Sequence, residues 1–351
     1  MSDHVEKDEI PVVGGFKVYS GDLLLDTEPE PLEWLVECLI PKGAKSVLAG
    51  STGSNKSFWC LQLALSLASG KGRFLGYDIP GPATVLYINT EGSLASVHRR
   101  VRGVADTLNI TDLSRFKLTG ERTSYDDLWT TVAIRELLVK YKPELLIIDN
   151  AYSSTIKDVS KNDVVRKFTT KLDRLKEQFN LTLLLVCHFN KGTYDQGFIL
   201  DRTSGASALI NWLECGILLT KSQHPDYEDL RLMKVDKLRD DEYSPDIWGL
   251  EWDHENTVLQ RVGLIDDVRP HLFNVHKAGH LHQTLEMMQD EFTTREWLDI
   301  VVEGENGART VSKQTAHNWL NRFCRDGLIK KVHQGVYNKT GMTIIRASKV
   351  G

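Results

Sequence analysis

The sequence lacks a long apolar run, a cluster of cysteines and an export signal. No window approaches the ~18 continuous apolar residues that a membrane span needs. The five cysteines are widely spaced without a C-x-x-C pair, which argues against a zinc site and predicts buried free thiols. Residues 1–9 are acidic and lack the cationic start and apolar stretch of a secretory signal. We therefore expect a cytoplasmic protein with no membrane association.

Charge is distributed unevenly along the chain. The net charge of −5 argues against a protein that coats nucleic acid over its whole surface. From Gly307 onward, however, the chain contains nine basic residues and a single acidic one, Asp326. This tail therefore has a net charge of +8, which leaves −13 for the remainder. The tail is therefore the segment most suited to a polyanion.

Apolar strands alternate with amphipathic helices from Ser46 onward. The expected strands are Ser46–Ala49, Thr84–Asn89, Leu145–Asp149, Leu181–Cys187, Cys215–Thr220 and Leu230–Lys234. The expected helices are Lys56–Ala68, Ser93–Leu108, Tyr125–Lys140, Lys161–Phe179 and Ala206–Leu213. This alternation predicts an α/β fold with a mostly parallel sheet flanked by helices.

We divide the chain into four parts, which are an N-terminal arm (1–31), the α/β domain (32–265), a linker (266–280) and a small second domain (281–351). Apolar periodicity fades between Glu251 and His282, which places the linker there. The second domain should contain the helices Leu281–Asp290, Thr294–Val302 and Lys313–Asp326, followed by the strands Leu328–Val332, Gly335–Tyr337 and Thr343–Arg346.

A turn rich in glycine and serine leads from the first strand into a helix. It consists of Gly50, Ser51, Thr52, Gly53, Ser54, Asn55, Lys56 and Ser57. In such a phosphate loop, backbone N–H groups point at the phosphates of ATP, Lys56 reaches the β- and γ-phosphates, and Ser57 ligates Mg²⁺. Asn55 stands where the pattern has Gly, but Asn tolerates a positive φ, so the turn should survive with an altered nucleotide affinity. The alternative is a turn without a ligand.

Two carboxylates follow strands that should end at the same edge of the sheet. Asp149 ends an apolar strand as a Walker B aspartate does, beside Mg²⁺. Glu91 follows the strand through Ile88, in a position to orient and deprotonate the attacking water. The alternatives are an ordinary strand-end Asp and a helix-capping Glu.

These segments resemble the RecA-like ATPases of the RepA type, a family that includes hexameric replicative helicases. The resemblance covers about Trp34 to Trp252 and rests on the phosphate loop and on Gly70–Gly76, Val85–Glu91 and Leu145–Asp149. It implies ATP hydrolysis with Mg²⁺ in a homo-oligomer such as a hexamer, with Glu91 as the catalytic base.

The same resemblance extends to three further positions. His188 matches a strand-end histidine that senses the γ-phosphate and communicates with a DNA-facing loop. Lys237 and Arg239 look like the Lys-x-Arg pair that ring ATPases insert into a neighbour's active site, with Lys234 as an alternative finger. The segment from Arg202 to Leu209 is similar to a segment of the family, with its Arg displaced by two residues. A strand-end histidine and a solvated basic turn are the alternatives.

A polar loop from Asn190 to Ser204 occupies the position of the pore loop in RecA-like proteins. Lys191, Tyr194, Phe198 and Arg202 give it cations and aromatic rings, a combination that suits single-stranded DNA. We therefore name Lys191 and Arg202 as candidate DNA contacts, with a plain connector as the alternative.

The second domain looks like a winged helix. Ser312 caps the helix that follows, whose inward face carries Trp319, Leu320 and Phe323. The residues left exposed for duplex DNA are Lys313, Gln314, Thr315, His317 and Asn318, followed by Lys330 and Lys331 on the ribbon. A protein-interaction winged helix is the alternative, and the local charge favours DNA.

The sequence thus predicts an ATP-dependent, oligomeric DNA-binding ATPase, similar to a RepA-type replicative helicase. One alternative is an ATP-regulated DNA-binding or recombination-mediator protein that does not unwind DNA. A small-molecule P-loop kinase is disfavoured, because a Lys-x-Arg finger and a winged helix have no use in such an enzyme.

Overall fold

The computed structural model describes residues 10–90, 92–120, 131–151, 162–189, 198–200, 203, 206–239, 241–244, 246–272, 285, 287–302, 312–325 and 328–340. They form two compact units. The second unit contains Ser222–Glu228 and the described residues from Asp266 onward, and the first unit contains the others. Among the helices of these residues, none has the length and apolar character that crossing a membrane requires.

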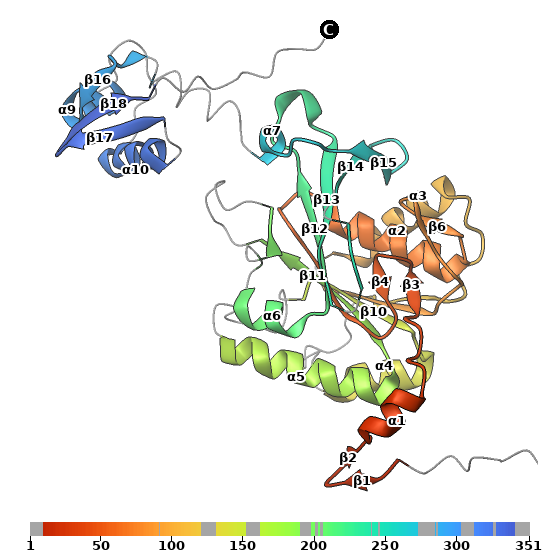
Figure 1. Cartoon of the computed structure of the whole chain (residues 1–351). Helices are drawn as coiled ribbons and strands as arrows, with labels where there is room; N and C mark the ends of the chain where they lie inside the picture. Colours follow the sequence, from red (N-terminus) through yellow and green to blue (C-terminus); the bar gives the residue numbers. More distant parts are fainter. Residues whose placement is uncertain are drawn as a thin grey trace, which may run out of the picture. The chain divides into compact units, whose positions relative to one another are not determined.

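A nine-stranded sheet organises the first unit (Figure 1). Its strands are β5 (Lys45–Gly50), β8 (Val85–Asn89), β9 (Phe116–Leu118), β10 (Leu145–Asp149), β11 (Thr182–His188), β12 (Cys215–Lys221), β13 (Leu230–Leu238), β14 (Ile247–Asp253) and β15 (Val258–Leu264). The order across the sheet is β15-β14-β13-β12-β5-β11-β10-β8-β9. The strands from β12 to β9 run parallel, and β13, β14 and β15 are added antiparallel. The predicted α/β fold with a mostly parallel sheet is confirmed.

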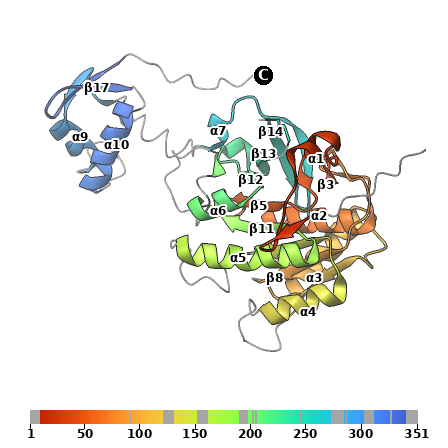
Figure 2. The same cartoon turned by 60° about the horizontal axis from the view of Figure 1, so that its bottom comes forward.

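Helices cover both faces of this sheet (Figures 1 and 2). One face is covered by α2 (Lys56–Ser69) and α3 (Leu94–Thr107), and the other by α4 (Thr131–Tyr141), α5 (Asn162–Phe179) and α6 (Ala206–Trp212). Because both faces are covered, the central strands are buried along their length, as Leu145–Asp149 shows. The carboxyl ends of the parallel strands therefore lie side by side in a rigid sheet.

The antiparallel side of the sheet is larger than the sequence predicted. β13 continues four residues beyond the expected end at Lys234, and β15 lies where the apolar pattern fades. The pattern fades because β15 is the edge strand, so several of its side chains are exposed. Short hairpins are formed by β1 (Val12–Val13) with β2 (Phe16–Lys17), by β3 (Trp34–Val36) with β4 (Ile40–Pro41), and by β6 (Arg73–Phe74) with β7 (Tyr77–Asp78).

The arm also contains α1 (Gly21–Asp26), none of whose residues is buried. Three of the five cysteines are buried free thiols, whereas Cys38 is exposed and Cys324 is half-buried. Cys38 lies at the turn between β3 and β4 and has a positive φ of 56°. The prediction of buried thiols is therefore wrong for Cys38.

The second unit contains a three-stranded sheet packed on two helices. Its elements are the short 3-10 helix Pro225–Tyr227, α7 (Arg269–Leu272), β16 (Glu291–Thr293), α9 (Thr294–Val301), α10 (Lys313–Arg325), β17 (Ile329–His333) and β18 (Val336–Lys339). Trp297 is fully buried in the centre of the core, and its indole N–H donates to the carbonyl of Ala316 at 2.9 Å. The strand expected at Thr343–Arg346 lies outside the described residues, as does half of the helix expected at Leu281–Asp290.

Candidate functional site

The turn between β5 and α2 has the backbone shape of a phosphate loop. Gly50 leaves β5 where a Cβ atom would come within 1.8 Å of the Leu219 carbonyl oxygen, so only glycine fits. Gly53 has a φ of +77°, and Asn55 is left-handed with φ 65° and ψ 29°. The Ser54 hydroxyl closes the turn by donating to the Ser51 carbonyl at 2.8 Å. Asn55 thus adopts the conformation expected of the glycine it replaces.

Lys56 begins α2 and is only 6% exposed. Its ammonium donates to the carbonyl oxygens of Gly50 at 3.1 Å and Ser51 at 2.7 Å. The side chain is therefore held against the inside of the loop at the positive end of the α2 dipole. Ser57, in the first turn of the same helix, is half-buried. This donor set fits the phosphates of a nucleotide.

Asp149 ends β10 at the same edge of the sheet and is 7% exposed. One of its carboxylate oxygens accepts a hydrogen bond from the hydroxyl of Tyr87, on the neighbouring strand β8. Burial, and then the charge of Asp149, raise the pKa of Tyr87 well above its ordinary value, so the phenol stays a donor. Tyr87 was not among the predicted site residues, because nothing in the sequence pairs it with a residue 62 positions away.

The thiol of Cys60 lies within reach of the charges of both Lys56 and Asp149. Burial is the main cause that raises the pKa of this thiol, the charge of Asp149 raises that pKa further, and the charge of Lys56 lowers it. The phosphate loop and the Walker B aspartate therefore lie within electrostatic range of one side chain. Magnesium bound to a nucleotide takes few protein ligands beside phosphate oxygens and water, and Ser57 with Asp149 fits that requirement.

Glu91 lies outside the described residues, but both of its neighbours are held in place. Thr90 donates its N–H to the Asp149 carbonyl at 2.8 Å, and its hydroxyl contacts both the N–H and the carbonyl of Asn150. On the other side, Gly92 exchanges two hydrogen bonds with the Asn89 side chain. The residues on either side of Glu91 are thus held by hydrogen bonds to the ends of β10 and β8.

His188 ends β11, the strand between the phosphate-loop strand and the Walker B strand. In the sheet it lies opposite Gly50, and the next N–H, that of Phe189, donates to the Gly50 carbonyl at 3.1 Å. The structure therefore places His188 beside the start of the phosphate loop. Lys191 and Arg202 lie outside the described residues, but a bridge between Phe189 and Thr203 holds the two ends of their loop together.

Lys237 and Arg239 lie at the other end of the strands, away from the phosphate loop. Because β13 is antiparallel to β12, Lys237 aligns with Gly216 near the amino-terminal end of the parallel strands. Along β13, the distance from Arg231 to Lys237 is roughly 20 Å at a rise of about 3.3 Å per residue. Lys237 donates to the Ile210 carbonyl at 2.8 Å, and Arg239 pairs with Glu214 at 3.8 Å. Neither residue reaches the phosphate loop of its own chain.

Lys234 is also engaged, through an ion pair with Asp236 at 2.5 Å. Burial is the main cause that lowers the pKa of Lys237, and the charge of Arg239 adds to the effect. Lys234 and Lys237 are therefore half-buried and bonded within the fold, whereas Arg239 is exposed.

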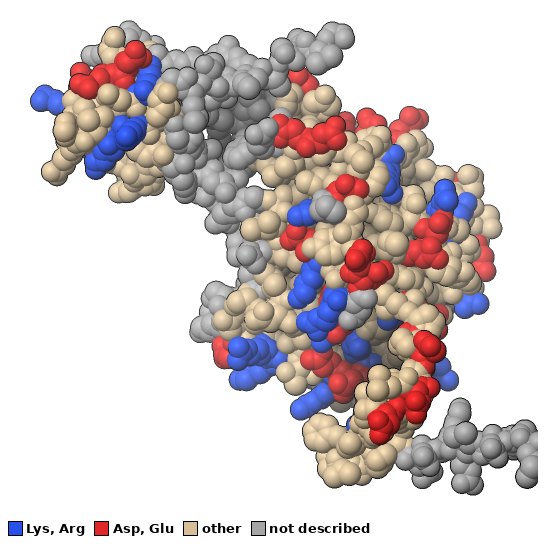
Figure 3. Space-filling view, viewed as in Figure 1, with Lys and Arg blue, Asp and Glu red and all other residues tan. Residues whose placement is uncertain are grey.

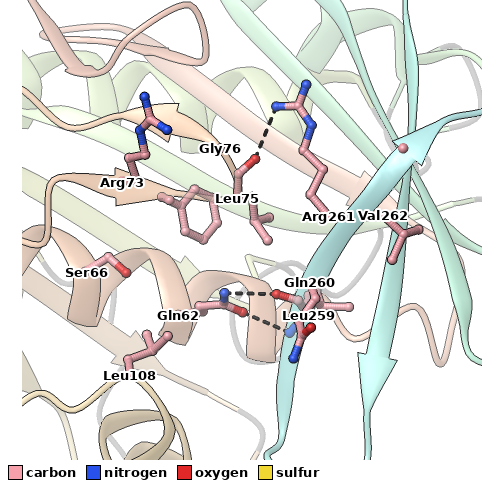
Figure 4. Close-up of a pocket in the computed structure, with 12 residues that line it drawn as sticks. Gln62, Ser66, Arg73, Leu75, Gly76, Leu108, Leu259, Gln260, Arg261 and Val262 are labelled. Atoms are coloured by element: carbon pink, nitrogen blue, oxygen red, sulfur yellow. Dashed lines mark hydrogen bonds between the residues drawn. The ribbon is translucent and has the colours of Figure 1, made fainter.

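A cavity of about 650 Å³ lies along the middle of α2, between the β6–β7 hairpin and β15 (Figure 4). The Gln62 amide donates to the Leu259 carbonyl at 3.1 Å and accepts from the Leu259 N–H at 3.0 Å. These bonds satisfy the backbone polar groups of Leu259 in the edge strand β15. Arg261 stacks on the Trp248 ring and donates to the Leu75 carbonyl at 3.3 Å. Because these polar groups attach the edge strand to the fold, we assign no ligand to this cavity.

The second unit presents its predicted DNA residues on α10 and β17. Lys313, Gln314, His317 and Asn318 are exposed and Thr315 is half-buried, while the opposite face of α10 packs into the core. The Ser312 hydroxyl accepts from the Thr315 N–H at 3.2 Å, as expected for a cap. On the ribbon, Lys330 and Lys331 are exposed. Figure 3 shows Lys and Arg side chains gathered over the side of this unit where α10 and β17 lie.

Comparison with known proteins shows the family to which the chain belongs. A family model described as an AAA domain matches residues 18–194, just over half of the chain. The chain belongs to this AAA domain family. The match includes the phosphate loop, the strand before Glu91, the Walker B strand and His188.

Among solved structures, the AAA domain chain is similar to a KaiC-like protein from the hyperthermophilic archaeon Pyrococcus horikoshii OT3. The TM-score is 0.50 at 15% identity, and the match covers 66% of this chain and 100% of that one. A search of curated proteins gave no match. Family and fold together confirm the prediction of a RecA-like P-loop ATPase.

Proposed function

We propose that this AAA domain protein hydrolyses ATP with Mg²⁺ and couples hydrolysis to DNA, acting as an oligomer in the manner of a RepA-type replicative helicase. The observation that carries the proposal is the joining of a phosphate loop and a Walker B strand to a C-terminal unit whose last part is strongly basic. The +8 lies in residues 307–351, the last part of that unit, in a chain of net charge −5.

The roles at the nucleotide site are assigned from the phosphate-loop pattern, the strand ends and the resemblance to RecA-like ATPases. Backbone N–H groups of the loop and the Lys56 ammonium bind the phosphates, and Ser57 and Asp149 would hold Mg²⁺, which would supply positive charge to the phosphate oxygens. Tyr87 holds Asp149 in one orientation through its hydrogen bond. Glu91 orients the attacking water and takes its proton, and His188 senses the γ-phosphate from the neighbouring strand end.

The placement of Lys237 and Arg239 supports an oligomer. Roughly 20 Å of β13 separates Lys237 from the phosphate-loop end of the strand, so it cannot stabilise a phosphoryl group in its own chain. Both residues are held at an edge where a second copy is able to approach them, and Arg239 is 47% exposed. We infer that they act on the nucleotide bound to that second copy, as expected for neighbouring subunits of a hexameric ring.

The second unit supports contact with duplex DNA. From β16 onward its described elements follow in the order strand, helix, helix, strand, strand, which is the order of a winged helix. Its exposed polar residues on α10 suit a DNA groove, and Lys330 and Lys331 on the ribbon suit phosphates. Single-stranded DNA is assigned to Lys191 and Arg202 of the loop after β11. An ATP-regulated DNA-binding or recombination-mediator protein without unwinding is the second candidate, because Asn55 departs from the loop pattern.

Neutralising the second unit tests the DNA assignment in the full-length chain. The triple variant Lys313→Ala, Lys330→Ala, Lys331→Ala should bind a short duplex more weakly, and the salt dependence of its affinity should fall by about one log unit per log salt for each lysine that contacts a phosphate. Fluorescence anisotropy at several salt concentrations measures both quantities.

A matched control removes three exposed lysines from the ATPase unit, Lys142→Ala, Lys167→Ala and Lys171→Ala, which changes the net charge equally. The control should retain most of the affinity. If both triple variants bind duplex as the wild type does, the second unit is not the duplex-binding module. It is then better explained as a protein-interaction domain.

A further inference from the structure

Arg231 is a buried cation that contacts the phosphate loop. It lies at the start of β13, is 4% exposed, and its Nε donates to the side-chain oxygen of Asn55 at 2.8 Å. The two residues are 176 positions apart in the sequence. Asn55 is the residue that departs from the phosphate-loop pattern, and it has the left-handed conformation with φ 65°. The residue that departs from the phosphate-loop pattern is therefore the one that the buried arginine contacts.

The sheet explains why the Arg231 side chain reaches this position. Arg231 pairs with Lys221 of β12, which places it at the edge where the parallel strands end. Met233, two residues further along and so on the same face, accepts a hydrogen bond from the Trp59 indole at 3.4 Å. This face of β13 thus covers the first turns of α2, and Arg231 meets the residue that precedes that helix.

Burial of Arg231 has an electrostatic cost, which a nearby negative charge reduces. Burial lowers the pKa of Arg231, while the charge of Asp229 raises it in part. The guanidinium joins Lys56 and the positive end of the α2 dipole, so three positive features converge on one turn. Such an arrangement favours the binding of phosphates.

We propose that Arg231 is a positioning residue of the nucleotide site, which holds the Asn55 side chain and thereby fixes the left-handed turn that glycine would adopt without help. An asparagine in a loop is otherwise able to bond its own backbone and leave this conformation. With the side chain held by Arg231, the backbone N–H groups that follow stay directed at the phosphates. This inference rests on the proposed ATP binding and adds to it the device that lets this chain dispense with the usual glycine.

A double-mutant cycle tests the pair directly. The four proteins are the full-length wild type, Arg231→Met, Asn55→Gly and the double variant, and the readout is the Kd for a fluorescent, slowly hydrolysed ATP analogue with Mg²⁺. In the wild-type background, Arg231→Met should weaken binding about tenfold, the effect of losing one charged hydrogen bond. In the Asn55→Gly background, where the turn needs no support, the same substitution should change Kd by no more than about twofold.

Arg261→Met is the matched control, because Arg261 is also an arginine of the antiparallel strands, half-buried, but contacts the β6–β7 hairpin. Its Kd should equal that of the wild type. Thermal unfolding of every variant checks the fold. If Arg231→Met does not fold, Arg231→Lys replaces it, and the same dependence on residue 55 is expected.

Each outcome decides the assignment. A loss of affinity only where Asn55 is present supports it. An equal loss in both backgrounds shows that Arg231 acts on the nucleotide itself or on the whole fold, and no loss in either shows that it does not act on the site; both results overturn the assignment while the proposed ATP binding stands. A wild-type chain that binds no analogue overturns the proposed function and this inference with it.

Discussion

The Lys56→Ala variant should bind ATP at least about a hundredfold more weakly than the wild type. Lys56 is the only basic side chain among the residues from Gly50 to Ser57, and its ammonium already bonds two loop carbonyls. Charged hydrogen bonds contribute about 1.5–3 kcal/mol each, so losing two contacts with the phosphates accounts for this change. Isothermal titration calorimetry with ATP and Mg²⁺ measures the affinity.

Lys71→Ala is the control for Lys56→Ala, since Lys71 is exposed beyond the other end of α2. It should bind ATP as the wild type does. A circular dichroism melt checks that both variants fold. Unchanged ATP affinity in folded Lys56→Ala would remove the phosphate loop from the account.

Glu91→Gln should separate binding from chemistry. The substitution keeps the shape of the side chain and removes the base, so ATP affinity should stay within about threefold while hydrolysis falls by roughly 10²–10⁴-fold. The bonds of Thr90 and Gly92 to the end of the Walker B strand and to Asn89 support this expectation, because they fix the chain on both sides of Glu91. Parallel measurements of nucleotide binding and phosphate release separate the two effects.

Glu251→Gln makes the same change of charge on the exposed surface of β14 and should hydrolyse ATP normally. Should Glu91→Gln release phosphate at the wild-type rate, another group must activate the water. A loss of binding and hydrolysis together would instead assign Glu91 a structural role in the turn after β8.

Local patterns in the sequence predicted the elements of the nucleotide site. Apolar strands that end in Gly50, Asp149 and His188 must end at one edge when they run parallel, so these residues were expected to converge before any distance was known. The turn from Gly50 to Ser57 was recognised because its glycines and its Lys-Ser pair have direct backbone and phosphate roles.

Contacts set by the register of distant strands were not predicted. The bond between Tyr87 and Asp149 and the bond between Arg231 and Asn55 join positions 62 and 176 residues apart. Neither pair has a local sequence signal. The edge strand β15 was missed for a different reason, since its exposed face interrupts the apolar pattern from which strands are recognised.

The Lys-x-Arg pair shows the limit of motif spacing. The motif places Lys237 and Arg239 after a strand, but only the antiparallel pairing of β13 with β12 shows that they lie at the far edge from the phosphate loop. Motif spacing alone does not separate a finger that acts within the chain from one that acts on another copy. The fold removes the first possibility.

The most direct test of the central claim is phosphate release by the full-length wild-type chain with ATP and Mg²⁺, measured with and without DNA. We expect turnover without DNA and a severalfold faster rate with DNA, with Glu91→Gln as the inactive reference. A rate equal to that of Glu91→Gln under both conditions would contradict ATP hydrolysis, and a rate that neither duplex nor single-stranded DNA changes would contradict the coupling of hydrolysis to DNA.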